Sequence, residues 1–555
     1  MAESPARRMA ANASAALGSA ARLSLWPALA AVGGAVLLKV GLLLWGTVPF
    51  NSDEAVVGLM ARHTLQGSVP IFFYGQAYLG SLDALLVALG FGLAGAHVWV
   101  IRAVQILLYA GTVATTYVLA GRVTRSTAAA VVAGLLMAVP TVNVTLYTTV
   151  SIGGYGEALL IGNLILLSAL AIWDRPAAGW LWPAWGFLCG FGLWVFGLTL
   201  AYSLPAAVLV GLRLLKDGPG RRVAARLGTS AAGAVVGASA WWGWAIQHGA
   251  GALVRELGGS AIAGASSPHW LASLGTHAAN LALLGTTVIL GLRPPWSVET
   301  LVWPLVPLVV AFWLAVLGFA WLRRFRLGAE SPGGWLVMGV GAVLLAAFVA
   351  SPFGADPSGR YFLPLWVVMA VAGGAMAAEV MRKWGGRLAW PMIAVVLVFN
   401  LAGTWQAALG NQTGLTTQFD PVARFDTSRL GDLAAFLRAH GETRGYTNYW
   451  VAYPLAFASN EDLIFIPRLP YHLDFRYSAR DDRYPPYDAL VAQSPKVAYI
   501  TTNHPLLDSR ISSALAARGV RFSQTAVGPY HVFYGLSQPV RLTPEELGLN
   551  EGTVP

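Results

Sequence analysis

Eleven apolar runs divide the first 409 residues of this chain, and they are the feature that most restricts its fold. They lie at about 26–45, 99–120, 127–148, 157–173, 178–193, 198–215, 228–247, 301–322, 334–350, 362–380 and 388–406. Such runs are suited to crossing a bilayer as helices. Hydrophobic residues make up 56% of the 555 residues and charged residues only 11%, which excludes an ordinary soluble enzyme. We therefore predict an α-helical polytopic membrane protein with about 11 transmembrane helices.

Cationic residues alternate between the loops and predict the topology. Seventeen Lys and Arg residues fall at the N-terminus and in every second loop, whereas the opposite loops hold only Arg62, Arg255, Arg293 and Arg360. By the positive-inside rule, the N-terminal segment 1–25 lies in the cytoplasm and the chain spans the cytoplasmic (inner) membrane. Before residue 410 the chain holds 23 Lys and Arg against 12 Asp and Glu, so the net charge of +10 reflects topology. We expect membrane lipids as partners and no nucleic acid.

The segment 47–98 is predicted to be one large first external loop. Within it, residues 77–96 look long enough to cross the membrane, but a crossing there would invert every later loop. We therefore expect a juxtamembrane or half-inserted helix. The first apolar run lacks a small-residue cleavage site, so we interpret it as a retained anchor.

The composition changes near residue 410, where ordinary charge density returns. Helical patterns at 427–440 and 508–518 alternate with strand patterns at 462–466, 497–501, 520–524 and 531–534. The sequence predicts a transmembrane domain over 26–409 and a small extracytoplasmic α/β domain over 410–555. Four aromatic residues cluster in this tail, and they predict either a packing seam against the membrane part or a wall of a substrate groove: Tyr446, Tyr449, Trp450 and Tyr453.

An acidic pair, Asp53 and Glu54, follows the first span, where we expect the external face of the membrane. Carboxylates beside hydrocarbon are energetically costly, so their presence there points to a function. A structural interpretation is equally specific, because Ser52 is a suitable N-cap and two acids in a first turn favour the helix dipole. In that case the face of Val56, Leu59, Met60 and His63 belongs to a helix lying on the membrane.

Other polar residues gather in the same external loops. They are Tyr74, Gln76 and Tyr78, then Tyr155 and Glu157, and finally Asp356, Arg360 and Tyr361 in the segment DPSGRYFLP. Glu157 is either a second acid facing Asp53 or a structural partner of Arg102. Arg360 is either a phosphate ligand, because its fork pairs with phosphate oxygens, or an interfacial anchor beside Tyr361. The single cysteine, Cys189, excludes an intramolecular disulfide and a cysteine-based metal cluster.

Taken together, these motifs resemble bacterial members of the GT-C glycosyltransferase superfamily, similar to protein O-mannosyltransferases and lipid A aminoarabinose transferases (glycosyltransferase family 39-like). The resemblance covers roughly residues 25–410. It rests on the acidic pair after the first span, a helix beginning YGQAYLG, an acid in the next external loop, and Arg-Tyr-x-x-Pro at a late span.

The resemblance implies transfer of a sugar from a polyprenyl-phosphate donor to an extracytoplasmic glycan, lipid or protein. It makes Asp53 the leading catalytic candidate, as general base on the acceptor hydroxyl or as a metal ligand, with Glu54 and Glu157 as further catalytic candidates. Arg360 and Tyr361 would bind the donor phosphate. Tyr74, Gln76 and Tyr78 would contact substrate.

A divalent metal is a possible cofactor, with Asp53 and Glu157 as candidate ligands. The chain has Ser-Asp-Glu rather than Asp-x-Asp, which leaves metal dependence open. The competing hypothesis is a transporter or flippase of a lipid-linked glycan, but paired halves with matching broken helices are not visible in the sequence.

Overall fold

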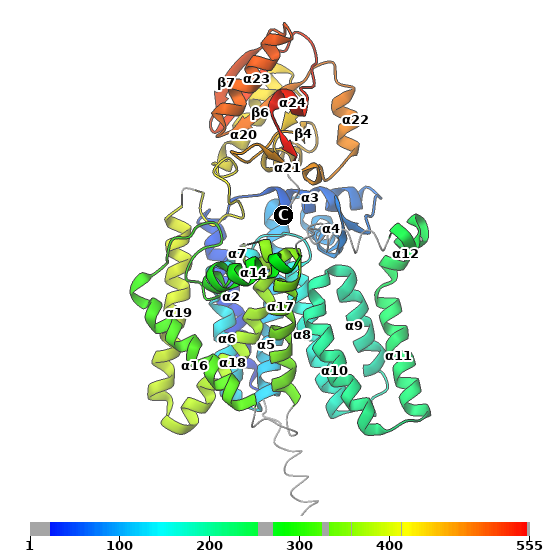
Figure 1. Ribbon diagram of the computed structural model, residues 1–555, viewed down its shortest axis with the longest axis vertical. Coiled ribbons are helices and arrows are strands. Elements are labelled where there is room, and N and C mark those ends of the chain that lie inside the picture. The colour runs from blue at the N-terminus through cyan, green and yellow to red at the C-terminus, as the bar shows by residue number, and fades with distance from the viewer. Residues whose placement is uncertain (1–22, 253–269, 325–331, 357, 412, 552–555) are drawn as a thin grey trace, which may run out of the picture.

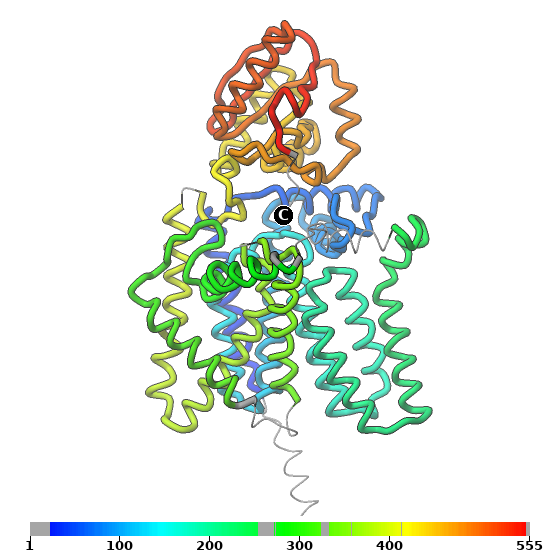
Figure 2. Tube along the Cα trace, viewed as in Figure 1, coloured from blue at the N-terminus to red at the C-terminus, as the bar shows by residue number. Residues whose placement is uncertain are grey.

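The computed structural model describes residues 23–252, 270–324, 332–356, 358–411 and 413–551. It consists of a helical bundle, a thin layer of helices at one end of that bundle, and an α/β domain on top of the layer (Figures 1 and 2). Most of the predicted N-terminal segment 1–25 lies outside the described residues.

Eight helices of the described part are long and apolar enough to cross a membrane, and they confirm a multi-pass membrane protein. Three further bundle helices match predicted spans but are shorter or less apolar, so the count of eleven stays a prediction. The bundle helices are α2 (Leu25–Leu44), α5 (Val98–Thr124), α6 (Thr127–Ala138), α8 (Tyr155–Asp174), α9 (Leu181–Val195), α10 (Leu200–Asp217), α11 (Arg221–Gly237), α16 (Val306–Arg324), α17 (Pro332–Ala350), α18 (Leu363–Trp384) and α19 (Gly386–Leu409).

Shorter elements join the bundle helices near the end that carries the α/β domain. These are α7 (Val142–Tyr147), η1 (Gly197–Thr199), α12 (Ser239–His248), α14 (Trp270–Asn280), η2 (Leu281–Gly285), α15 (Thr286–Ile289), η3 (Trp303–Leu305), η4 (Pro352–Ala355) and η5 (Arg360–Phe362). Helix α14 crosses the bundle at this end (Figure 1).

The first external loop folds into α3 (Ser52–Leu65), the hairpin β1 (Phe72–Phe73) and β2 (Gln76–Gly80), and α4 (Leu82–Ala94). The expected helix beginning YGQAYLG is therefore wrong over residues 76–80, because this segment pairs with Phe72 and Phe73 as a strand. Helix α4 has 13 residues and spans about 20 Å, too short to cross a bilayer. Figure 1 shows α3 and α4 between the bundle and the α/β domain.

The predicted α/β domain is confirmed in outline. Its central sheet has the order β4-β3-β6-β8-β7, in which β4, β3 and β6 are parallel and β8 pairs antiparallel with both β6 and β7. The strands are β3 (Arg444–Thr447), β4 (Ile464–Pro467), β6 (Ala498–Thr502), β7 (Ser523–Val527) and β8 (Tyr530–Tyr534), with a separate pair β5 (Arg476–Tyr477) and β9 (Asn550–Glu551). The helices are η6 (Thr427–Arg429), α20 (Leu430–His440), α21 (Tyr449–Ala458), η7 (Ala479–Asp481), α22 (Pro486–Ala492), α23 (Pro505–Ala517) and α24 (Pro544–Leu547).

Helix α21 docks the domain onto α3. Gly58 makes the approach possible, because a Cβ there would lie 2.5 Å from the Phe457 ring. Arg62 donates a hydrogen bond to the Phe457 carbonyl at 2.8 Å, and its guanidinium lies 4.0 Å from the centre of that ring. Buried residues lie on both faces of α3. The prediction of a helix that lies on the membrane with a single buried face is therefore wrong. The docking fixes the start of α3 against the domain.

Candidate active site

Helix α3 begins with a capping box that holds the acidic pair in place. The Asn51 side chain accepts a hydrogen bond from the Glu54 backbone N–H at 3.0 Å, and the Glu54 carboxylate accepts one from the Asn51 N–H at 3.4 Å. Asn51 is therefore the N-cap, and the expectation that Ser52 has this role is wrong. Ser52 instead donates a hydrogen bond to the carbonyl of Tyr449 at 2.6 Å.

Glu54 is fully buried and forms an ion pair with Arg102. The Arg102 Nε and Nη2 atoms lie 3.0 Å from the two carboxylate oxygens. The predicted structural pair of Arg102 with Glu157 is therefore wrong, because Arg102 reaches back to α3. This geometry favours a structural role for Glu54, since both of its oxygens are already engaged.

Asp53 is partly exposed and has a different environment. Its Oδ1 atom accepts a 2.6 Å hydrogen bond from the hydroxyl of Tyr449. Burial, followed by the Asp53 charge, raises the pKa of Tyr449 well above its usual range, so this hydroxyl stays protonated and donates. Among the described residues, no cation lies within ion-pair distance of Asp53. Its second oxygen therefore remains available for a substrate.

Arg483 brings a positive charge to the same place. Its guanidinium lies close enough to interact with the charges of Asp53 and Asp481 and with Tyr78. The Gln76 carboxamide oxygen, in the orientation that satisfies both groups, accepts hydrogen bonds from the two terminal nitrogens at 2.7 and 3.0 Å. We call Asp53, Tyr449, Arg483 and Gln76 the Asp53 cluster.

A second cluster surrounds Arg360. Its Nε and Nη2 atoms lie 2.9 and 2.8 Å from Oδ2 of Asp356, and the guanidinium lies 5.1 Å from the centre of the Tyr361 ring. Asn143 donates a hydrogen bond to the Gly359 carbonyl at 3.1 Å and so holds this loop against α7. The Arg360 side chain is 41% exposed, which leaves it accessible to a ligand. We call Asp356, Arg360 and Tyr361 the Arg360 cluster.

Two tyrosines connect the clusters. Tyr147 is buried at the end of α7, and the charges of both Arg360 and Asp53 act on it. Tyr78 interacts with Arg483 and with Tyr361. The two clusters therefore lie near each other, in one polar region at the domain end of the bundle.

The remaining predicted residues lie elsewhere or have other partners. Glu157 is buried, neither of its oxygens has a hydrogen-bond partner among the described residues, and Asp83 rather than Asp53 is the carboxylate whose charge acts on it. Asp83 itself accepts hydrogen bonds from Gln105, at 2.8 Å, and from Ser151. The structure thus brings Glu157 together with Asp83.

Tyr74 contributes to the contact between the layer and the α/β domain. Its hydroxyl lies 2.8 Å from Nδ1 of His63, and its ring stacks on Tyr484 at 4.7 Å. On the other side, His63 lies 3.0 Å from Glu461. Of the three residues predicted to contact substrate, Tyr78 lies within the polar region and Gln76 positions Arg483.

The described residues do not build a complete set of protein ligands for a divalent metal. No group of three or more His, Cys, Asp or Glu side chains gathers within the part of the chain that the structure describes. The two candidate ligands also have separate neighbours, since Asp53 lies beside Tyr449 and Glu157 beside Asp83.

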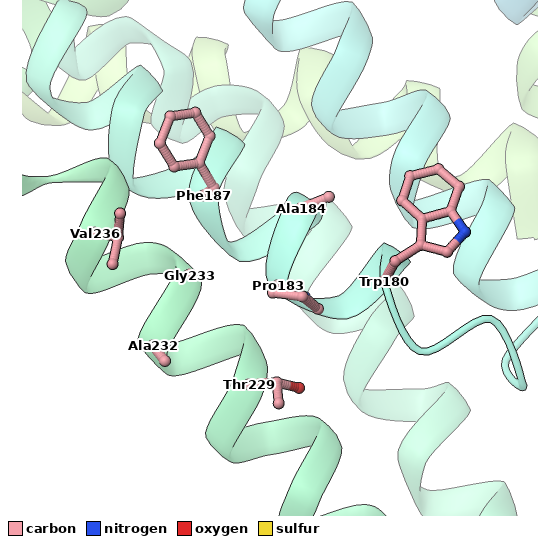
Figure 3. Close-up of a pocket in the computed structure, with 8 residues that line it drawn as sticks. All are labelled: Trp180, Pro183, Ala184, Phe187, Thr229, Ala232, Gly233 and Val236. Atoms are coloured by element: carbon pink, nitrogen blue, oxygen red, sulfur yellow. The ribbon is translucent and has the colours of Figure 1, made fainter.

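A groove of about 540 Å³ lies on the surface between α9 and α11 (Figure 3). It is lined by Trp180, Pro183, Ala184, Phe187, Thr229, Ala232, Gly233 and Val236. None of these residues belongs to either polar cluster, and the lining is almost entirely apolar. The groove is therefore a surface feature of the bundle and lies outside the candidate site.

No protein-family model and no curated protein matches the chain. Solved structures do match it. ArnT from Cupriavidus metallidurans bound to undecaprenyl phosphate is similar with a TM-score of 0.53 and 14% identity, covering 92% of this chain and 99% of that one. The chain has the GT-C fold. An apo structure of the same ArnT gives a TM-score of 0.54 over 90% of this chain and 98% of that one, at 14% identity.

An oligosaccharyltransferase from Archaeoglobus fulgidus, in complex with Zn and sulfate, is also similar. Its TM-score is 0.51 at 13% identity, over 92% of this chain and 73% of that one. These likenesses confirm the predicted GT-C fold and extend it over most of the chain, beyond the span of roughly 25–410 on which the sequence motifs lie.

Sequence reasoning missed the roles of Tyr449 and Arg483. The aromatic density around Tyr449 was visible, but its hydrogen bond to Asp53 joins residues 396 positions apart. Arg483 lies in the segment RDDRYPP, where nothing in the local pattern separates it from a surface arginine.

Proposed function

We propose that this protein is an integral-membrane glycosyltransferase that uses a polyprenyl-phosphate-linked sugar. The observation that carries the proposal is Asp53, an acid without an ion-pair partner among the described residues, held in a polar region on a GT-C fold. The bound undecaprenyl phosphate of the similar ArnT supports a lipid phosphate as the donor's carrier. The acceptor is a glycan, lipid or protein on the extracytoplasmic side of the inner membrane.

In this mechanism Asp53 is the general base. The acceptor hydroxyl gives its proton to Asp53, and its oxygen forms a bond to the anomeric carbon of the sugar. The bond between that carbon and the phosphate oxygen breaks, and its electron pair leaves with polyprenyl phosphate. A positioned carboxylate contributes on the order of 10²- to 10⁴-fold to such a proton transfer.

Arg360 is proposed to stabilise the leaving phosphate. Asp356 engages its Nε and Nη2 atoms from one side, and the partly exposed guanidinium still offers hydrogen atoms to a ligand. A fixed cation is most effective where negative charge develops in the transition state. Tyr361 interacts with Arg360, and Tyr78 interacts with Arg483, so we expect the sugar to lie beside these two tyrosines.

The test uses purified full-length protein with a panel of polyprenyl-phosphate sugars, and it measures release of polyprenyl phosphate. We expect turnover with at least one donor and a loss of on the order of 10²-fold or more in Asp53→Asn, which keeps the shape and removes the base. Donor binding should survive this substitution. Turnover of Asp53→Asn within a few-fold of wild type would overturn the assignment of the base. No release from any donor would count against the proposed function itself.

A further inference from the structure

The α/β domain reaches the candidate base directly. Tyr449, the first residue of α21, donates its hydroxyl to Asp53 at 2.6 Å, and its backbone carbonyl accepts the hydrogen bond from Ser52 at 2.6 Å. The Asn448 side chain caps α21 by accepting from the Trp450 N–H at 3.0 Å. The residue that touches Asp53 is therefore held at both its backbone and its hydroxyl.

Arg483 comes from the same domain, just after η7. Its guanidinium lies 5.4 Å from the centre of the Tyr449 ring and donates to Gln76 of the layer. Within the described residues it forms no ion pair shorter than 4 Å, and its Nε atom is buried without a hydrogen-bond partner. A partly buried arginine with unused donors lies beside an acid that also lacks an ion pair.

Domain docking alone does not explain this arrangement. The contact between α3 and α21 already has Gly58 against Phe457, Arg62 on the Phe457 carbonyl, and His63 beside Glu461 at 3.0 Å. Leaving two opposite charges near each other without a direct pair costs desolvation energy. Such a cost is typical of functional sites, where charged groups are kept available for a substrate.

We propose that the α/β domain completes the catalytic site, with Tyr449 orienting the Asp53 carboxylate and Arg483 balancing its negative charge from the opposite side of the interface. Tyr449 occupies one carboxylate oxygen and leaves the other for the acceptor hydroxyl. Both are positioning residues for the base. The inference rests on the proposed function, because it assigns these roles relative to Asp53 as base.

The experiment compares Tyr449→Phe, Arg483→Met and Arg483→Lys in the full-length protein. Each variant keeps most of the packing volume of the original side chain. Tyr449→Phe removes the hydroxyl, Arg483→Met removes the charge, and Arg483→Lys keeps the charge. Two changes in the same domain are matched controls. Tyr499→Phe removes a buried hydroxyl bonded to the Val540 carbonyl, and Arg518→Met removes the ion pair with Glu546. Thermal unfolding of every variant reports on folding, and kcat and KM for the donor are measured separately across pH.

We expect kcat to fall roughly tenfold or more in Tyr449→Phe, the scale of a lost hydrogen bond to a charged group. It should fall further in Arg483→Met, and Arg483→Lys should restore most of the loss because it returns the charge. The KM for the donor should stay within about twofold. The acid limb of the pH–rate profile should move to higher pH in Arg483→Met, since a neighbouring cation favours a charged carboxylate.

A merely structural role predicts lower melting temperatures with an unchanged pH profile and an unchanged kcat per folded molecule. Values of kcat within twofold of wild type for folded Tyr449→Phe and Arg483→Met would overturn the inference. If these two variants keep wild-type kcat while Asp53→Asn is inactive, only the roles of Tyr449 and Arg483 are rejected and the proposed function stands. Inactivity of wild type with every donor would instead reject the proposed function.

Discussion

Arg102 holds Glu54 through two parallel contacts of 3.0 Å each, from helix α5 to the first turn of α3. A third contact of Arg102, to the Pro49 carbonyl at 3.1 Å, ties the chain that enters α3. The position of the neighbouring Asp53 therefore depends on the ion pair between Arg102 and Glu54, although Asp53 is not part of that pair. This geometry supports different roles for the two acids, in which Glu54 fixes the helix and Asp53 faces the candidate site.

Breaking this ion pair should lower the free energy of unfolding and leave kcat of the folded protein nearly unchanged. Glu54→Leu leaves Arg102 buried without its partner, and such a loss costs on the order of 3–5 kcal/mol. The double variant Glu54→Leu/Arg102→Met should recover much of the melting temperature, because apolar residues of similar size can replace a buried pair. Its kcat, measured in detergent at a temperature where it is folded, should lie within a few-fold of wild type. A folded double variant with a 10²-fold lower kcat would give Glu54 a chemical role.

Gly58→Ala should loosen the docking of the α/β domain. The added Cβ would lie 2.5 Å from the Phe457 ring and 3.1 Å from Ile101, and overpacking of this kind costs about 1–3 kcal/mol. We expect faster proteolytic release of residues 410–555 together with reduced turnover. Gly41→Ala in α2 is the control, because a Cβ there meets nothing within 4 Å. Equal protease resistance of the two variants would show that Gly58 is not needed for close approach.

How far the sequence predicted the fold follows from the range of the interactions. Hydropathy and loop charge depend on neighbouring residues, and they predicted the bundle and the α/β tail. The partner of Arg102 could not be found this way, because Glu54 and Glu157 are both acids near the same boundary. Likewise, Gln76–Gly80 has a helix-compatible sequence, and its pairing with Phe72–Phe73 makes it a strand. The link from Asp53 to Tyr449 depends on how two domains dock, which local patterns do not encode.

Asp481 should make stability depend on pH. Burial raises the pKa of its carboxyl to about 7, against a smaller opposing effect of Arg483. The folded state then keeps the proton on Asp481 at pH values where the unfolded state, with the usual carboxyl pKa of 3.8, has released it. The stabilisation is full below that value and is lost as pH rises through about 7.

Asp481→Asn should therefore melt like wild type near pH 4 and be more stable near pH 8, by on the order of 2–4 kcal/mol. Thermal unfolding of the purified protein across this pH range measures the difference. The exposed Asp432→Asn is the control, because its carboxyl is 57% exposed and pairs with Arg429 at the surface. A difference that stays constant with pH would contradict the protonated state of Asp481.

The predicted topology places Ser126 and Ser509 on opposite sides of the membrane. Helix α5 begins beside Glu54 and, with 27 residues, extends about 40 Å to the turn that contains Ser126. Ser509 is exposed on α23 of the α/β domain. Cysteines are introduced singly at these positions in a Cys189→Ala background and labelled in intact cells with a membrane-impermeant reagent. We expect labelling at 509 only, and labelling of both positions would reject the orientation.

Arg360→Lys should weaken donor binding more than turnover. The substitution keeps the positive charge but loses the planar fork that pairs with phosphate oxygens, and lysine cannot reproduce the two contacts with Asp356. We expect the KM for the donor to rise roughly tenfold, with kcat falling by less. Arg382→Lys is the matched control, since Arg382 pairs with Glu379 at an exposed position of α18. An anchoring role at the membrane surface predicts the opposite pattern, because lysine anchors as well as arginine does and would leave the donor KM unchanged.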